Sequence, residues 1–290
     1  MSIIDAVIAH QTGFLKPKPV NEKGYLTSLR PEDNLIERFP NWEEIKKELN
    51  KGKGSELKGK LPKFCSVRSS SALCVNNFAP FKQYYAELSF LGYSRFSESL
   101  FEKQQPTGLE DRTPPHLDFY LENKTAIIGI ESKFTEYFGK KKPNHGDNLR
   151  PYLDGWNTLK QHFSDLSADF RKEILEHYAH ADNNESQYLD VAQLIKHTIG
   201  LRGNRNGKKV ILVYLYWEPL NPTVDKRFAK YHKRFAKHQS EIADFKCRIE
   251  RFIEFVPLSY PELWKRYEND ALLKEHIGKV RERYGFPIKS

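Results

Sequence analysis

The stretch that decides the fold is LDFYLENKTAIIGIESKF, residues 117–134. Two runs rich in β-branched and aromatic residues flank the polar residues 122–124, and this pattern predicts a β-hairpin. Side chains alternate along a strand, so Glu131 and Lys133 are expected to project from the same face. The second strand is apolar as far as Ile130 and then presents Glu-Ser-Lys, which marks its end as a candidate site.

The turn decides which residue of the first strand lies near these two side chains. If Asn123-Lys124 is a two-residue turn, Asp118 lies across from Gly129, and any turn of even length puts Asp118 on the face of Glu131 and Lys133. Asp118 and Glu131 are then diagonal neighbours, with Cβ atoms within roughly 7–8 Å and open space at Gly129. One hard cation can bridge two carboxylates across that gap.

Two carboxylates and a lysine are the groups that metal-assisted hydrolysis of a phosphodiester needs. A bound cation polarises the phosphoryl oxygen, lowers the pKa of a bound water and neutralises charge in the transition state. Lys133 would position the attacking water or stabilise the pentacovalent phosphate, and a base role is a further alternative. The pattern Asp-x₁₂-Glu-x-Lys is loose, and charged residues that alternate with apolar ones also mark the wet face of an edge strand.

Composition indicates a globular protein, and its basic charge suits a polyanionic partner, although many basic proteins bind no nucleic acid. Of its 290 residues 39% are hydrophobic and 13% aromatic, which argues against disorder. The net charge of +9 and a pI near 9.2 suit a nucleic acid. The sequence has no apolar run near the ~20 residues of a membrane span and no signal peptide, so we expect a cytoplasmic protein. Cys65, Cys74 and Cys247 lack metal spacing and are expected to be reduced and buried.

Hydrophobic periodicity predicts an α/β protein around the hairpin. We divide the chain into an N-terminal arm and linker, residues 1–60, and a domain with a C-terminal helical extension, residues 61–290. The arm is expected to be irregular over residues 1–40, followed by a short helix at 41–50. The other predicted elements are a helix at 70–92 that Pro80 kinks or divides, a strand at 94–101, helices at 159–178 and at 188–197 that stops near Gly200, a strand at 209–217 buried on both faces, a basic amphipathic helix at 224–246, a strand at 251–257 and a terminal helix at 261–284.

The segments PPHLDFYL, residues 114–121, and IIGIESKF, residues 127–134, resemble the signature of the PD-(D/E)XK nuclease superfamily. That signature is an Asp near the start of one strand and (Asp/Glu)-x-Lys on the next. The literal Pro-Asp pair is absent, because two residues separate Pro115 from Asp118. The resemblance covers roughly residues 69–217 and extends to a branch of restriction endonucleases. It implies a central mixed β-sheet flanked by helices in the order αβββαβ, with N- and C-terminal helical additions.

The resemblance also implies roles for individual residues. The two hairpin carboxylates become metal ligands, and Lys133 acts at the nucleophile. An acidic residue of the first core helix often joins the metal site in such nucleases, and Glu87 is the best placed one, with a solvated helix residue as the alternative. On the helix after the hairpin, Gln193 matches a polar residue that faces the site, and His197 lies one turn further on the same face. For both residues, polar cover of the helix is the alternative.

Two basic segments are candidate DNA contacts. Lys140, Lys141 and Lys142 follow the second hairpin strand directly and are expected near the phosphate backbone, where cations give affinity without reading sequence. A solvated loop is the alternative for this run. The basic helix at 224–246 is either a second DNA surface or an ordinary surface helix.

The leading hypothesis is therefore an endonuclease of the restriction type that hydrolyses DNA with Mg²⁺, for which Mn²⁺ can substitute. Double-stranded DNA and a homodimer are implied by the resemblance, with no membrane and no nucleotide cofactor. The alternatives are a catalytically inactive nucleic-acid-binding module of the same fold, a repair or RNA nuclease, and a basic scaffold protein. The sequence has no Gly-rich phosphate loop, no Gly-x-Ser-x-Gly and no His-Glu-x-x-His, which argues against nucleotide hydrolysis, serine hydrolysis and zinc proteolysis.

Overall fold

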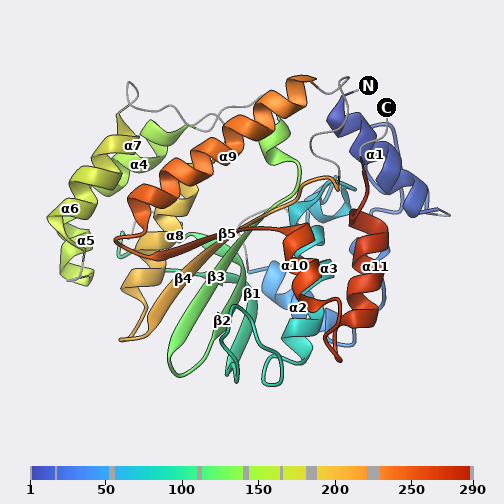
Figure 1. The fold of residues 1–290 in the computed structure, drawn as a ribbon, viewed down its shortest axis with the longest axis horizontal. Coiled ribbons are helices and arrows are strands. Elements are labelled where there is room, and N and C mark those ends of the chain that lie inside the picture. Colours follow the sequence, from blue (N-terminus) through green and yellow to red (C-terminus); the bar gives the residue numbers. More distant parts are fainter. Residues whose placement is uncertain are drawn as a thin grey trace.

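A mixed β-sheet lies at the centre of the protein (Figure 1). The computed structural model describes residues 2–16, 18–51, 56–109, 113–139, 144–163, 166–180, 188–220 and 229–287. The sheet strands, in spatial and chain order, are β1 (Glu98–Gln104), β2 (His116–Glu122), β3 (Ala126–Lys133), β4 (Lys209–Tyr216) and β5 (Glu254–Ser259). The first three strands are antiparallel, whereas β3, β4 and β5 are parallel. The predicted α/β class with a central mixed sheet is confirmed.

The β2–β3 hairpin turns at Lys124-Thr125, one residue later than predicted. The Asn123 side chain sets this turn, because its Oδ1 accepts hydrogen bonds from the backbone N–H of Thr125 at 2.9 Å and of Ala126 at 2.8 Å. The backbone N–H of Asn123 also donates to the carbonyl of Ala126. Since the turn still has two residues, the same residues of the two strands share a face as in the predicted hairpin.

The corrected register changes the neighbour of Gly129. Tyr120 lies opposite Gly129, and the same register continued past Phe119–Ile130 places Asp118 directly across from Glu131. The expectation of open space at Gly129 was wrong. A Cβ there would lie 2.7 Å from Leu117 and 2.9 Å from Leu201 side-chain atoms.

Helices cover both faces of the sheet (Figure 1). Strand β4 explains why, because its side chains alternate between two buried clusters and none of residues 210–216 is exposed. One face packs against α1 (Ile3–Phe14), α2 (Trp42–Leu49), α3 (Ser70–Gln83), α10 (Tyr260–Tyr267) and α11 (Lys274–Tyr284). The other packs against α4 (His145–Asp154), α5 (Trp156–His162), α6 (Ala168–Phe170), a π-helical turn (Arg171–Glu176), α7 (His177–Ala179), α8 (Val191–Gly203) and most of α9 (Ala229–Ile249).

Helix α3 ends at Gln83, nine residues before the predicted end, and it runs through Pro80 without dividing. Proline has no N–H to donate to the carbonyl four residues earlier, which belongs to Asn76. His276 of α11 takes over that carbonyl, with its Nε2 at 2.8 Å from the Asn76 oxygen. A contact with a helix 200 residues away therefore compensates the proline.

Several other predicted boundaries were wrong. The irregular arm begins with a helix, α1, which Ser2 and Asp5 stabilise through a capping box. Helix α8 passes Gly200, and Cys247 is exposed rather than buried. The predicted helix at 159–178 is interrupted after His162, and the terminal helix at 261–284 is two helices, α10 and α11.

Among the described residues, none of the helices combines the length and apolar character needed to cross a bilayer.

The N-terminal arm packs directly on the C-terminal helices. Arg283 of α11 is 0% exposed, and its guanidinium donates to the Gln11 side chain and to the backbone and side-chain oxygens of Asn34. A buried guanidinium must have its donors satisfied. The arm is therefore joined to the body by polar contacts as well as by the shared apolar core.

We expect Arg283→Ala to lower the free energy of unfolding by about 3 kcal/mol, because it leaves buried acceptors on the arm without donors. Urea denaturation measures the change. Arg281→Ala is the matched control: Arg281 is half exposed in its pair with Glu268, so the loss should stay below about 1 kcal/mol. Equal losses in the two variants would contradict this account.

Candidate active site

Strands β2 and β3 separate where the predicted site residues lie. The last hydrogen-bonded pair is Phe119–Ile130. One residue further along β2, the Asp118 carboxylate accepts a hydrogen bond from the backbone N–H of Ser132 at 2.6 Å. In a continued ladder that N–H would point to the backbone of β2. The Asp118 side chain is therefore held in the gap between the two strands.

Glu131 is the most tightly held carboxylate of the group. It is 2% exposed, and its two oxygens contact the Lys133 ammonium at 2.6 Å and the His197 Nε2 at 2.8 Å. Burial alone would raise the pKa of Glu131, but the charges of Lys133 and His197 lower it to about 2. Glu131 is therefore ionised throughout the physiological range.

Lys133 connects the hairpin to helix α8. Its ammonium also donates to the side-chain oxygen of Gln193 at 2.8 Å. Burial lowers the pKa of Lys133, but the neighbouring carboxylates of Glu131, Glu136 and Asp118 outweigh it and raise the pKa above its usual value. Lys133 is therefore a protonated cation in this arrangement, which favours a positioning role over a base role.

Asp118 has the opposite electrostatic surroundings to Glu131. Burial raises the pKa of Asp118 well above its usual range, and the negative charges of Glu131 and of Glu102 on β1 raise it further. The charge of Lys133 and the hydrogen bond from Ser132 oppose this shift without cancelling it. An uncompensated carboxylate beside a second one is the donor set that a hard divalent cation suits.

Asp118 and Glu131 are the residues that would hold such a cation. Both oxygens of Glu131 are engaged by Lys133 and His197 here. Within the described ranges, no three His, Cys, Asp or Glu side chains are already gathered in the manner of a metal centre. The two carboxylates are suitable ligands for a hard cation. In this arrangement, however, the Glu131 carboxylate is paired with Lys133 and His197.

These side chains line a pocket of about 410 Å³ to which six parts of the chain contribute. The pocket-lining residues are Glu56, Lys63, Ser70, Ser71, Glu102, Thr113, His116, Asp118, Glu131, Ser132, Lys133 and Gln193. Ser70 and Ser71 begin α3, whereas Glu56 and Lys63 come from the predicted linker and the start of the predicted core. Residues on both sides of the proposed boundary at residue 60 therefore take part in the pocket.

The structure brings together most, but not all, of the predicted site residues. Asp118, Glu131, Lys133 and Gln193 line the pocket. His197 is not part of the lining and contacts the Glu131 carboxylate from the protein interior. Glu87 is exposed and lies beyond the far end of α3, about 20 Å along the helix axis from Ser70. It is therefore not brought into the group, because the helix ends before it. The run Lys140, Lys141 and Lys142 lies outside the described residues.

The sequence did not point to Glu102. Nothing in the local pattern distinguishes it from the neighbouring charged residues of β1. Its position depends on how β1 pairs with β2, and that pairing has no signal within a single strand.

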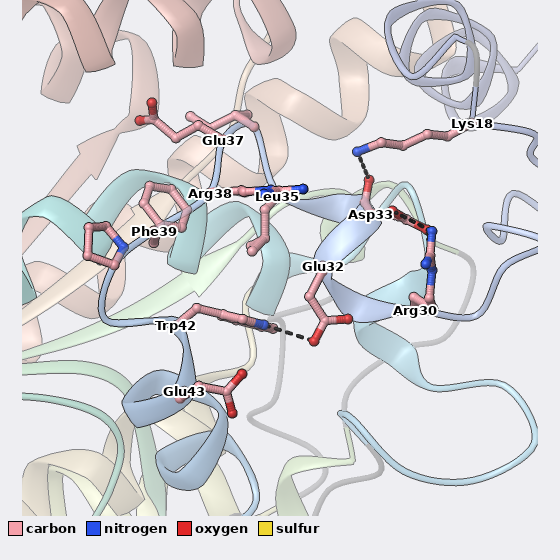
Figure 2. Close-up of a pocket in the computed structure, with 12 residues that line it drawn as sticks. Lys18, Arg30, Glu32, Asp33, Leu35, Glu37, Arg38, Phe39, Trp42 and Glu43 are labelled. Carbon is pink, nitrogen blue, oxygen red and sulfur yellow. Dashed lines mark hydrogen bonds and ion pairs between the residues drawn. The ribbon is translucent and has the colours of Figure 1, made fainter.

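A larger pocket, of about 800 Å³, lies in the N-terminal arm (Figure 2). Most of its carboxylates already have partners inside the pocket or just outside it. Asp33 contacts Arg30 at 3.0 Å and its carbonyl accepts from Lys18, while Glu32 accepts from the indole N–H of Trp42. These contacts order the arm and leave no set of groups suited to hydrolysis, so the smaller pocket is the candidate active site.

The fold and the pocket define an α/β protein with a cluster of carboxylates at the carboxyl end of a sheet strand, together with Lys133 of the same strand. The chain belongs to the family described as Restriction Endonuclease associating with ARP, REase-ARP, whose model matches residues 2–285. The resemblance to restriction endonucleases is thereby confirmed, and it extends over the N-terminal arm as well. No curated protein and no solved structure matches the chain.

The two carboxylates should respond to substitution in opposite directions. In buffer with EDTA, we expect Asp118→Asn to raise the free energy of unfolding by on the order of 1 kcal/mol. The raised pKa of Asp118 means that its ionised form destabilises the folded protein at neutral pH, and an amide oxygen can still accept from Ser132. Urea denaturation at pH 7 measures the change.

Glu131→Gln provides the contrast in the same experiment. It should lower stability by about 2 kcal/mol or more, because it removes the charge that Lys133 and His197 share. Changes of the same sign in Asp118→Asn and Glu131→Gln would show that the charges at this site are not balanced as described.

Proposed function

We propose that this protein is a Mg²⁺-dependent endonuclease of the restriction type that hydrolyses phosphodiester bonds of DNA. The observation that carries the proposal is the buried Glu131–Lys133 pair beside Asp118, at the end of an otherwise apolar strand. Burying such a charged group is costly, so its retention in an apolar setting indicates a role in chemistry. The family description supports the same class of enzyme.

Each residue of the group has a separate task in this proposal. Mg²⁺, when bound, would activate a water and neutralise charge on the scissile phosphate. Asp118 and Glu131 hold the cation, and His197 keeps the Glu131 carboxylate in place from the buried side. The Lys133 ammonium, oriented by Gln193, stabilises the negative charge that develops on the phosphate.

Double-stranded DNA is the proposed substrate. The net charge of +9 favours a polyanion, and Lys63 adds a cation to the pocket that contains Lys133. A homodimer, with one site for each strand of a duplex, completes the proposal, and Mn²⁺ is expected to substitute for Mg²⁺.

Cleavage of plasmid DNA in Mg²⁺, Mn²⁺ or EDTA tests this function, with a mixed set of plasmids and genomic fragments so that a specific sequence is represented. We expect cleavage with either cation and none in EDTA. Asp118→Ala and Lys133→Ala should each lower the rate about a hundredfold or more, since each removes a group that acts on the transition state.

Lys124→Ala is the matched control for Lys133→Ala, because Lys124 is an exposed lysine in the turn of the same hairpin. It should cut at the native rate. Cleavage that continues unchanged in both site variants, with folding verified by circular dichroism, would refute the assignment of this site.

A further inference from the structure

The alternation of side chains breaks at the same level in β1 and β2. Residues two apart on a strand normally share a face. Phe119 packs in the cluster of α3, whereas Leu117 packs in the cluster of α8, on the opposite face. On β1, Phe101 likewise packs with the α3 cluster, whereas the Lys103 ammonium lies over the Tyr120 ring of the α8 cluster. In both strands, therefore, side chains two residues apart point to opposite faces of the sheet at this level.

Glu102 and Asp118 are the residues at which the alternation breaks. Pairing holds on both sides of them, at Phe101–Phe119 and Lys103–Leu117, which places Glu102 directly across from Asp118. Asp118 follows directly on Phe119, the last residue of β2 that pairs with β3, and its carboxylate accepts from the backbone N–H of Ser132 on β3, next to Glu131. Carboxylates from three adjacent strands therefore line the same pocket.

The backbone at Glu102 is strained. Its φ of +50° lies in the left-handed region, which costs a residue with a Cβ roughly 1–2 kcal/mol relative to glycine. Strain of this kind persists where the surrounding structure enforces it, and it concentrates at functional sites. A glycine would adopt this conformation with less strain, so the presence of a glutamate indicates a function for its side chain.

The Glu102 carboxylate is also poorly compensated. Its side chain is 13% exposed, and its carboxylate lies 3.5 Å from His116 Nδ1. Other glutamates of these strands have a lysine partner, as in the pairs Glu98–Lys103 at 3.1 Å and Glu122–Lys208. Both ring nitrogens of His116 are buried without a hydrogen-bond partner among the described residues. Glu102 therefore lines the pocket with no lysine or arginine as ion-pair partner among the described residues.

We propose that Glu102 is the third carboxylate of the cation site, together with Asp118 and Glu131, in the role that the sequence had suggested for Glu87. The inference rests on the proposed metal-dependent function and adds to it a ligand from the edge strand. Three carboxylates at one site repel one another unless a cation lies among them. A divalent ion would relieve that repulsion and use the geometry that the strained backbone provides.

Binding of Mn²⁺ in the absence of DNA tests the inference separately from cleavage. Titration followed by electron paramagnetic resonance gives the affinity of the native protein, Glu102→Gln, Glu131→Gln and Glu98→Gln. Glu98→Gln is the matched control, being the same substitution on the same strand outside the pocket. We expect Glu102→Gln and Glu131→Gln to bind Mn²⁺ at least about tenfold more weakly than the native protein, and Glu98→Gln to bind it equally well.

Glu102→Gly separates a ligand from a structural residue. It should raise the Tm measured without metal, because glycine adopts the left-handed conformation without strain, and should weaken Mn²⁺ binding as Glu102→Gln does. Native affinity in Glu102→Gln, with Glu131→Gln weakened, would overturn the role of Glu102 and leave the proposed function standing. Absence of Mn²⁺ binding by the native protein would overturn both.

Discussion

The site depends on the requirement that a charged group buried at the end of an apolar strand must find opposite charges and hydrogen-bond partners around it. Strand β3 is buried along almost its whole length, so Glu131 enters the protein interior as an anion. Lys133 from the same strand and His197 from α8 compensate it. Because an unpaired carboxylate there would cost several kcal/mol, the position of α8 on the sheet is linked to the chemistry of the strand.

The same compensation does not extend to the neighbouring carboxylates. Asp118 receives a backbone hydrogen bond but also the repulsion of Glu131 and Glu102. The protein therefore stores unfavourable electrostatics, and left-handed backbone strain at Glu102, within one pocket. Such a combination costs stability. In the proposed function a divalent cation bound among these carboxylates would offset that cost, which is how a cation-binding site differs from a structural ion pair.

The sequence predicted what local patterns determine. The hairpin, the buried strand β4 and the shared side of Glu131 and Lys133 follow from alternation. The predicted closeness of Asp118 to Glu131 survived an incorrect turn because both turns have two residues, although the Asp118 side chain lies in the gap between the strands. Features that depend on distant contacts could not be predicted. Helix α3 tolerates Pro80 because His276 donates a hydrogen bond to the Asn76 carbonyl, which has lost its partner in the helix. Glu102 reaches the site through the pairing of β1 with β2. Glu87 is not brought to the pocket, because α3 ends at Gln83 whereas the apolar spacing that predicted the helix continues past it.

The central claim is that Asp118 and Glu131, at the opening between β2 and β3, hold a divalent cation. A crystal structure of the protein grown with Mn²⁺, with anomalous data collected at the manganese edge, tests this most directly. The account predicts an anomalous peak at coordination distance from carboxylate oxygens of both residues. A structure in which Mn²⁺ occupies another site, while Lys133 and His197 still hold both oxygens of Glu131, would contradict it.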